Sequence, residues 1–229
     1  MEFAGRHVVV TGGTGALGTA VVEMLLARGN TVHLPIQEAA LPAHLPWRDR
    51  VHAVPGVSLD DEQHVMAFYK SLPGLWASIH LVGGFAMAPV TETSLADFEK
   101  QWRINTVTCF LACREAVRAM GATKTGGRIV NVAARPVITP TPGMIAYAAA
   151  KAGVAELTQS LAAEVLAQGI LVNAVLPSLI DTPVNRAAMP KADHASWPKP
   201  AQIAETIAFL ASEQNTLTTG TLIPVFGRV

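Results

Sequence analysis

Two side chains that could transfer a proton together lie four residues apart in the second half of the sequence. Tyr147 and Lys151 fall in an alanine-rich run that is predicted to be helical, so their side chains share one face, one turn apart. A nearby ammonium group favours the phenolate form and is expected to lower the pKa of Tyr147. The pair therefore predicts a general acid or base that works near neutral pH.

A glycine cluster far upstream has the composition of an anion-binding turn. Gly13, Gly15 and Gly18 form a G-x-G-x-x-G pattern that follows an apolar run and opens a helical one. Glycines let the backbone approach a pyrophosphate, and the free N–H groups at a helix start favour negative charge. The pattern favours a dinucleotide site over a plain tight turn. Lys151 is expected to bond to the ribose of that dinucleotide. Its expected contacts are Gly12, Gly13, Thr14, Gly15, Leu17 and Gly18.

The end of the second predicted strand lacks the acid that usually reads the cofactor ribose. The strand ends at Ile36, which can neither accept a hydrogen bond from a 2′-hydroxyl nor pair with a 2′-phosphate. Glu38 lies two residues further on. The sequence therefore leaves NAD and NADP both open as the cofactor.

Short apolar runs alternate with longer amphipathic ones along the whole chain. This pattern is typical of a doubly wound parallel sheet with helices on both faces, a three-layer α/β/α fold. Prolines 42 and 46 interrupt the place of one crossover helix, and the proline-rich stretch 177–200 is long enough to be a substrate lid. About seven strands are expected, at His7–Thr11, Val32–Ile36, Val51–Val54, Ile79–Val82, Arg128–Ala133, Ile170–Leu176 and Leu222–Val225. The longest helices are expected at Asp61–Ser71, Leu95–Met120, Ala146–Ala167 and Ala201–Ala211.

Composition narrows the class of partner. The 229 residues are 50% hydrophobic and carry 17 basic and 17 acidic side chains, which predicts a single domain over 1–229 that binds a small molecule rather than nucleic acid. The longest apolar run is too short for a bilayer, and the N-terminus lacks a secretory signal, so we expect a cytoplasmic protein. Cys109 and Cys113 are interpreted as buried small hydrophobes, and the spacing of the seven histidines predicts no metal site.

With these motifs the chain resembles the short-chain dehydrogenase/reductase family over essentially its whole length. The resemblance implies a seven-stranded Rossmann sheet, a nicotinamide cofactor, and a homodimer or homotetramer. It implies that Tyr147 gives or takes the proton, that Lys151 binds the ribose, and that Asn105 supports a proton-relay water. The implied cofactor contacts further along the chain are Val82, Gly83, Pro177, Ile180 and Thr182.

One departure from the family pattern concerns the substrate. Ala134 stands where the family has its catalytic serine, and a methyl group cannot polarise a carbonyl oxygen. Segments around Thr141–Tyr147, Asp181–Arg186 and Met189–Asp193 resemble the dihydropteridine reductase branch, which also lacks the serine. That resemblance implies hydride transfer from a reduced nicotinamide to a quinonoid dihydropterin.

Two other functions stay open at the level of the sequence. One is a reductase or dehydrogenase of ordinary carbonyls and alcohols, in which Thr139 or Thr141 supplies the missing hydroxyl. The other is an NAD(P)-binding sensor without turnover.

Overall fold

The computed structural model describes residues 5–228, which build a seven-stranded parallel sheet in the order β3-β2-β1-β4-β5-β6-β7. The expected doubly wound α/β fold is confirmed. The strands are β1 His7–Thr11, β2 Thr31–Pro35, β3 His52–Val54, β4 Ala77–His80, β5 Gly127–Val132, β6 Ile170–Pro177 and β7 Leu222–Val225. The strand order reverses next to β1, and ligands of such sheets bind beyond the carboxyl ends of the strands at that switch point.

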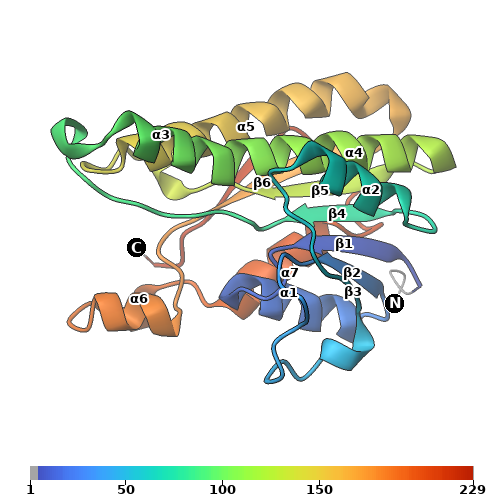
Figure 1. The fold of residues 1–229 in the computed structure, drawn as a ribbon, viewed down its shortest axis with the longest axis horizontal. Coiled ribbons are helices and arrows are strands. Elements are labelled where there is room, and N and C mark those ends of the chain that lie inside the picture. Colours follow the sequence, from blue (N-terminus) through green and yellow to red (C-terminus); the bar gives the residue numbers. More distant parts are fainter. Residues whose placement is uncertain (1–4, 229) are drawn as a thin grey trace.

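Helices cover both faces of the sheet (Figure 1). On one face α1 packs beside α7, and on the other face α4 lies between α2 and α5. Two apolar cores follow from this arrangement, one on each side of the strands. The helices are α1 Ala16–Ala27, α2 Glu62–Lys70, α3 Leu95–Trp102, α4 Thr108–Thr123, α5 Ile145–Val165, α6 Pro183–Ala188 and α7 Pro200–Leu210. Within residues 5–228 no helix combines the length and apolar character that crossing a membrane requires.

Two features of the connections refine the sequence-based expectations. As the prolines suggest, the segment between β2 and β3 holds one short 3₁₀ turn, Arg48–Arg50, in place of a crossover helix. The single long helix expected over Leu95–Met120 is instead α3 and α4 joined by a π-helical turn, Arg103–Val107. Such turns insert one extra residue per turn and re-aim the side chains that follow.

Three histidines on neighbouring strands lie side by side at β1, β2 and β3. His7 Nδ1 is 2.9 Å from His33 Nε2, and the His33 ring stacks on His52 with centroids 5.1 Å apart. His33 is 7% exposed. Burial, and then repulsion from His7 and His52, lowers the pKa of His33 to about 4.

The neutral His33 predicts acid sensitivity. In the unfolded chain His33 binds a proton below pH about 6.5, whereas in the folded protein it does so only near pH 4. The stabilisation that neutral His33 contributes is therefore fully present above pH 6.5 and is lost as the pH falls from 6.5 to about 4. We expect the free energy of unfolding to fall by up to about 3 kcal/mol through this group. Urea titrations between pH 8 and 5 measure this fall in the free energy of unfolding. The fall should be smaller in His33→Gln and unchanged in His44→Gln, a control at an exposed histidine. Equal acid loss in wild type and His33→Gln would contradict the assignment.

Candidate active site

The glycine turn between β1 and α1 is closed by backbone contacts that exclude side chains. Gly12 has φ +69° and its carbonyl oxygen accepts from the amide of Gly15 at 3.1 Å. A Cβ on Gly18 would overlap that carbonyl oxygen and lie 2.7 Å from Gly13 Cα. Gly15 is the N-cap of α1, and the helix start has neither a side-chain cap nor an acidic residue in its first turn. This open, uncapped helix start fits the pyrophosphate of a dinucleotide.

Asn105 joins the π-helical turn to the segment that follows β4. Its Nδ2 donates to the carbonyl oxygens of Gly84 and Gln101, both at 3.0 Å, and its Oδ1 accepts from the Gly84 amide at 3.2 Å. Asn105 is 1% exposed, and a Cβ on Gly83 would lie 2.6 Å from its Oδ1. These hydrogen bonds hold the Asn105 amide against the Gly83–Gly84 backbone.

Lys151 points into the same place from α5. Its Nζ donates to the carbonyl oxygen of Val132 at 2.8 Å, and it lies 3.1 Å from the position that a Cβ on Gly83 would take. Tyr147, one turn earlier, has its ring centroid 6.0 Å from Lys151 Nζ and packs edge-on against Phe85, with centroids 5.1 Å apart. The fold therefore brings Tyr147, Lys151, Asn105 and Gly83 together, as expected from their positions in the sequence.

The electrostatics of the pair differ from the expectation for Tyr147. Burial raises the pKa of Tyr147 to about 12, whereas the sequence predicted a lowered value. The Lys151 ammonium bonds to the Val132 carbonyl rather than to the phenol, and burial lowers the pKa of Lys151 to about 8. In this structure the phenol is protonated at neutral pH, which suits a proton donor.

Ala134 lies where β5 leaves the sheet, two residues after the carbonyl that binds Lys151. It is 4% exposed. Thr139 and Thr141, the candidate replacements for a hydroxyl, are exposed, and the Thr141 hydroxyl donates to the Thr139 carbonyl at 3.3 Å. Neither threonine therefore reproduces a buried hydroxyl beside Lys151.

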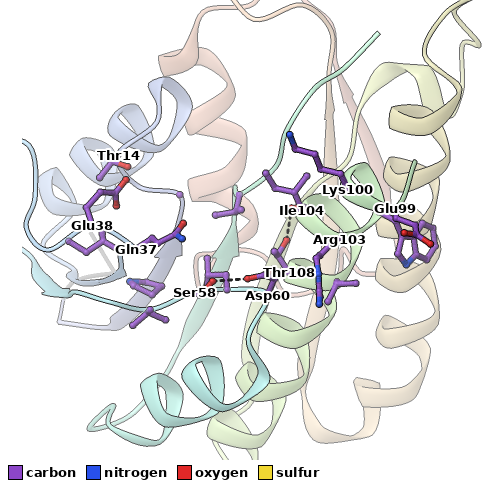
Figure 2. A pocket seen from close by; sticks show the side chains of 18 of the residues that line it. Thr14, Gln37, Glu38, Ser58, Asp60, Glu99, Lys100, Arg103, Ile104 and Thr108 are labelled. Carbon is purple, nitrogen blue, oxygen red and sulfur yellow. Dashed lines mark hydrogen bonds and ion pairs between the residues drawn. The ribbon is translucent and has the colours of Figure 1, made fainter. Parts of the chain in front are cut away.

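A cleft of about 1160 Å³ opens beside the glycine turn (Figure 2). Thr14, Gln37 and Glu38 lie on one wall, and Lys100 and Arg103 come from the helix on the other wall. Of the expected cofactor contacts it includes Gly12, Gly13, Thr14 and Val82, together with Ile36. The cleft does not extend to the remaining expected contacts or to Tyr147. Those residues are Gly15, Leu17, Gly18, Gly83, Lys151, Pro177, Ile180 and Thr182.

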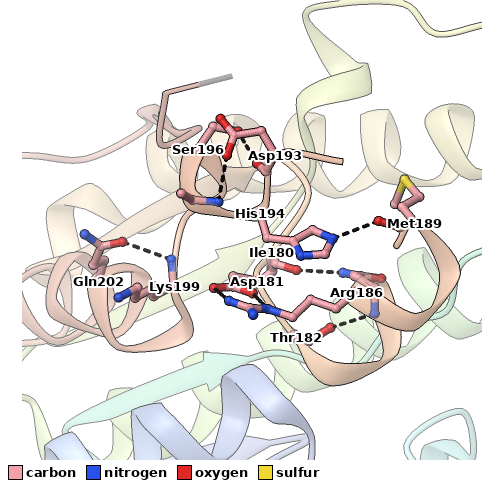
Figure 3. Close-up of polar contacts among 12 residues, drawn as sticks. Ile180, Asp181, Thr182, Arg186, Met189, Asp193, His194, Ser196, Lys199 and Gln202 are labelled. Carbon is pink, nitrogen blue, oxygen red and sulfur yellow. Dashed lines mark hydrogen bonds and ion pairs between the residues drawn. The ribbon is translucent and has the colours of Figure 1, made fainter. Parts of the chain in front are cut away.

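The segment 177–200 is more ordered than its prolines suggest. It contains α6, whose N-cap Thr182 accepts from the amide of Asn185, while Asn185 Nδ2 donates to the Ile180 carbonyl at 2.8 Å. Arg186 donates to both carboxylate oxygens of Asp181, and His194 Nε2 lies 2.7 Å from the Met189 carbonyl oxygen (Figure 3).

The base of this segment is anchored to the body of the fold, and its middle protrudes. Ser178 Oγ donates to the Phe226 carbonyl at 2.7 Å, and the Arg228 amide donates to the Ser196 carbonyl at 2.9 Å. Trp197 is 6% exposed and packs against His194, whereas Met189 is 38% exposed. Trp197 thus packs onto its own domain, while α6 extends away from the sheet (Figure 1).

Sequence reasoning missed the groups that hold the site residues in place. Lys151 is positioned by the Val132 carbonyl, and Asn105 by the Gly84 backbone and the Gln101 carbonyl. Backbone carbonyls leave no signal in residue type, so spacing could not identify them. The π turn has no sequence signature either.

Comparisons with known proteins identify a family and similar sequences. A family model described as short chain dehydrogenase matches residues 6–193. The chain is 33% identical to a cis-4-hydroxycyclohexanecarboxylate dehydrogenase of Sinomonas cyclohexanicum, covering 98% of this chain and 96% of that protein. It is 32% identical to a 3-beta-hydroxysteroid dehydrogenase of Comamonas testosteroni, covering 96% and 93%.

Solved structures resemble the fold over nearly its whole length. A dehydrogenase/reductase from Sinorhizobium meliloti 1021 superposes with a TM-score of 0.84 at 27% identity, covering 99% of this chain and 96% of the other. The structure "ElxO with NADP Bound" superposes with a TM-score of 0.89 at 24% identity, covering 97% and 98%.

Proposed function

The chain belongs to the short-chain dehydrogenase family and is an oxidoreductase, and we propose that it reduces quinonoid dihydropterins or similar cyclic conjugated substrates with NADH or NADPH. The observation that carries the proposal is Ala134: a buried methyl group replaces the hydroxyl that would polarise a carbonyl, while Tyr147, Lys151 and Asn105 are all present. An electron-poor conjugated ring needs a proton but offers no simple ketone to polarise. The likeness of the 141–147, 181–186 and 189–193 segments to dihydropteridine reductases supports the same substrate class.

The glycine turn and α5 are proposed to hold the cofactor. Cβ atoms on Gly12, Gly13 and Gly18 would collide with neighbouring protein atoms, so these glycines let the turn close tightly, and the start of α1 has no side-chain cap that would compete with a pyrophosphate. ElxO, a protein of similar fold, has been solved with NADP bound. NADH or NADPH, when bound, supplies the hydride. Further contacts are proposed from Leu17, Val82, Pro177, Ile180 and Thr182.

Each polar side chain of the site has a proposed role in moving the proton. Tyr147, protonated at neutral pH, donates the proton from its Oη as the substrate accepts hydride. Lys151 is held by the Val132 carbonyl on the same side of the site and stabilises the phenolate that remains. Asn105 holds the Gly83–Gly84 backbone in place through its hydrogen bond to Gly84.

The 177–200 segment is proposed to cover the substrate as a lid.

A substrate comparison with Ala134→Ser tests the proposal. Wild type should oxidise NADH or NADPH with chemically generated quinonoid dihydropterin and reduce cyclic ketones slowly. Because one positioned donor is worth about 10²- to 10³-fold in kcat, Ala134→Ser should gain on ketones by roughly that factor. Cofactor consumption is followed by nicotinamide absorbance with both cofactors.

Efficient ketone reduction by wild type, without turnover of the pterin, would favour the second candidate function. That function is a dehydrogenase of cyclic alcohols, and it is supported by the two relatives, which are named for hydroxycyclohexanecarboxylate and hydroxysteroid substrates. Saturable cofactor binding without turnover of either substrate class would contradict both.

A further inference from the structure

Two cysteines and a histidine meet in the interior, between β4 and α4. Cys109 and Cys113 lie one turn apart on α4, with their Sγ atoms 4.0 Å apart, and Cys113 Sγ is 3.5 Å from His80 Nδ1. One ligand atom from each residue lies within 4.8 Å of the others. We propose that Cys109, Cys113 and His80 form a buried binding site for a thiophilic divalent cation such as Zn²⁺.

Two of the three separations between ligand atoms match a tetrahedral zinc site closely. With Zn–S near 2.3 Å and Zn–N near 2.0–2.1 Å, tetrahedral geometry places two sulfurs about 3.8 Å apart and a sulfur and a nitrogen about 3.6 Å apart. The observed separations are 4.0 Å for the two sulfurs and 3.5 Å for Cys113 Sγ and His80 Nδ1. The third separation, between Cys109 Sγ and the His80 ring nitrogen, is within 4.8 Å, so an ion could be accommodated if the Cys109 side chain shifts by up to about 1 Å.

Asn131 on β5 offers a fourth ligand. Its Oδ1 is 3.5 Å from Cys113 Sγ and 2.8 Å from His80 Nδ1. Its Nδ2 donates to Thr158 Oγ1 at 2.9 Å, which orients the amide oxygen toward the cysteines and the histidine. Tetrahedral geometry would separate oxygen and nitrogen by about 3.3 Å, so the Asn131 oxygen would move outward by roughly half an ångström.

The histidine has an outer partner that permits metal ligation. His80 Nε2 is 2.8 Å from Ser78 Oγ. Without an ion, Nδ1 donates to the Asn131 amide oxygen, which can only accept. A hydroxyl both donates and accepts, so on ion binding the ring can change tautomer, with Nε2–H donating to Ser78 and an unprotonated Nδ1 facing the ion. Metal-binding histidines commonly donate their second N–H to an oxygen in this manner.

Burial and ligand softness favour zinc over magnesium or calcium. His80, Cys109 and Cys113 are 4%, 5% and 3% exposed. Two thiolates balance the charge of a divalent ion, which makes the buried complex neutral, and sulfur ligands select thiophilic metals. Spacing along the chain predicted no metal site because His80 is 33 positions from Cys113, and only the fold brings them together.

A titration with Co²⁺ tests the site, in the presence of a reductant that contains no metal ions and keeps both cysteines reduced. The chain has 2 cysteines, so any thiolate-to-cobalt charge-transfer absorption reports on Cys109 and Cys113. We expect this absorption to saturate at one equivalent of Co²⁺, to be displaced by Zn²⁺, and to accompany a rise in Tm, because the ion binds the folded state.

Matched variants assign the ligands. Cys109→Ala and Cys113→Ala should each weaken binding about a hundredfold or more, beyond the 10- to 100-fold cost of losing an outer partner. If the alanine variants do not fold, Cys109→Ser and Cys113→Ser are used in their place. His52→Ala, in the separate histidine cluster, should retain the absorption. The proposal is overturned by absence of the absorption in folded wild type, by its full retention in the cysteine variants, or by a fall in Tm on adding Zn²⁺.

Discussion

Tyr147→Phe is expected to lower kcat by about 10²- to 10⁴-fold on whichever substrate the enzyme reduces, the range typical of a lost general acid. The substitution removes the hydroxyl and keeps the ring that packs edge-on against Phe85. Because burial raises the pKa of Tyr147 to about 12, the phenol is protonated at neutral pH and can supply the proton that a reduction consumes. Steady-state kinetics measure kcat, and a fluorescence titration should show unchanged affinity for NADH or NADPH.

Tyr69→Phe is the matched control, since the chain has 2 tyrosines. Tyr69 is buried, and its hydroxyl lies 2.8 Å from Ser78 Oγ. Its loss should cost about 1 kcal/mol of unfolding free energy and leave turnover close to wild type. Turnover by Tyr147→Phe at more than a tenth of the wild-type rate would remove Tyr147 from its proposed role.

Gly18→Ala should abolish cofactor binding and destabilise the fold. A Cβ at this position would overlap the Gly12 carbonyl oxygen and lie 2.7 Å from Gly13 Cα, and both are backbone atoms that cannot rotate away. Overpacking of this kind costs about 1–3 kcal/mol or more, which exceeds the gain of about 0.5–1 kcal/mol from replacing glycine in a helix. Thermal unfolding and an NADH titration measure the two effects.

Gly15→Ala separates binding from folding. The nearest atom to a Cβ on Gly15 is the Gly12 carbonyl oxygen at 3.4 Å, an ordinary contact, so Tm should stay near the wild-type value. If the turn holds a pyrophosphate, the added methyl group should still weaken cofactor binding strongly. A Gly18→Ala protein with wild-type Tm and cofactor affinity would contradict the geometry of the turn, and a Gly15→Ala protein with wild-type affinity would contradict the pyrophosphate assignment.

The sequence predicted strands well where apolar runs are bounded by glycine or proline. The bounds of β1 and β7 match the expectation, and the missing crossover helix after β2 follows from its prolines. The fourth strand was predicted two residues too late, because polar Ser78 interrupts the apolar run near its start, and Leu81 and Val82 extend that run past its end. Ser78 and His80 are nevertheless buried, and His80 Nδ1 lies 2.8 Å from Asn131 Oδ1 on β5. A sequence pattern cannot recognise a polar residue whose partners are elsewhere in the chain.

By itself the sequence determined the order of strands and helices, the glycine turn and the Tyr147–Lys151 pair. These depend on near neighbours in the chain, where steric exclusion at glycine and the helical repeat act directly. Only the tertiary structure decided that Lys151 bonds to Val132, that a π turn aims Asn105 at Gly84, and that His80 meets the cysteines. Such contacts depend on which strands become neighbours in the sheet and on how the helices pack across them, and that information is spread over the whole chain.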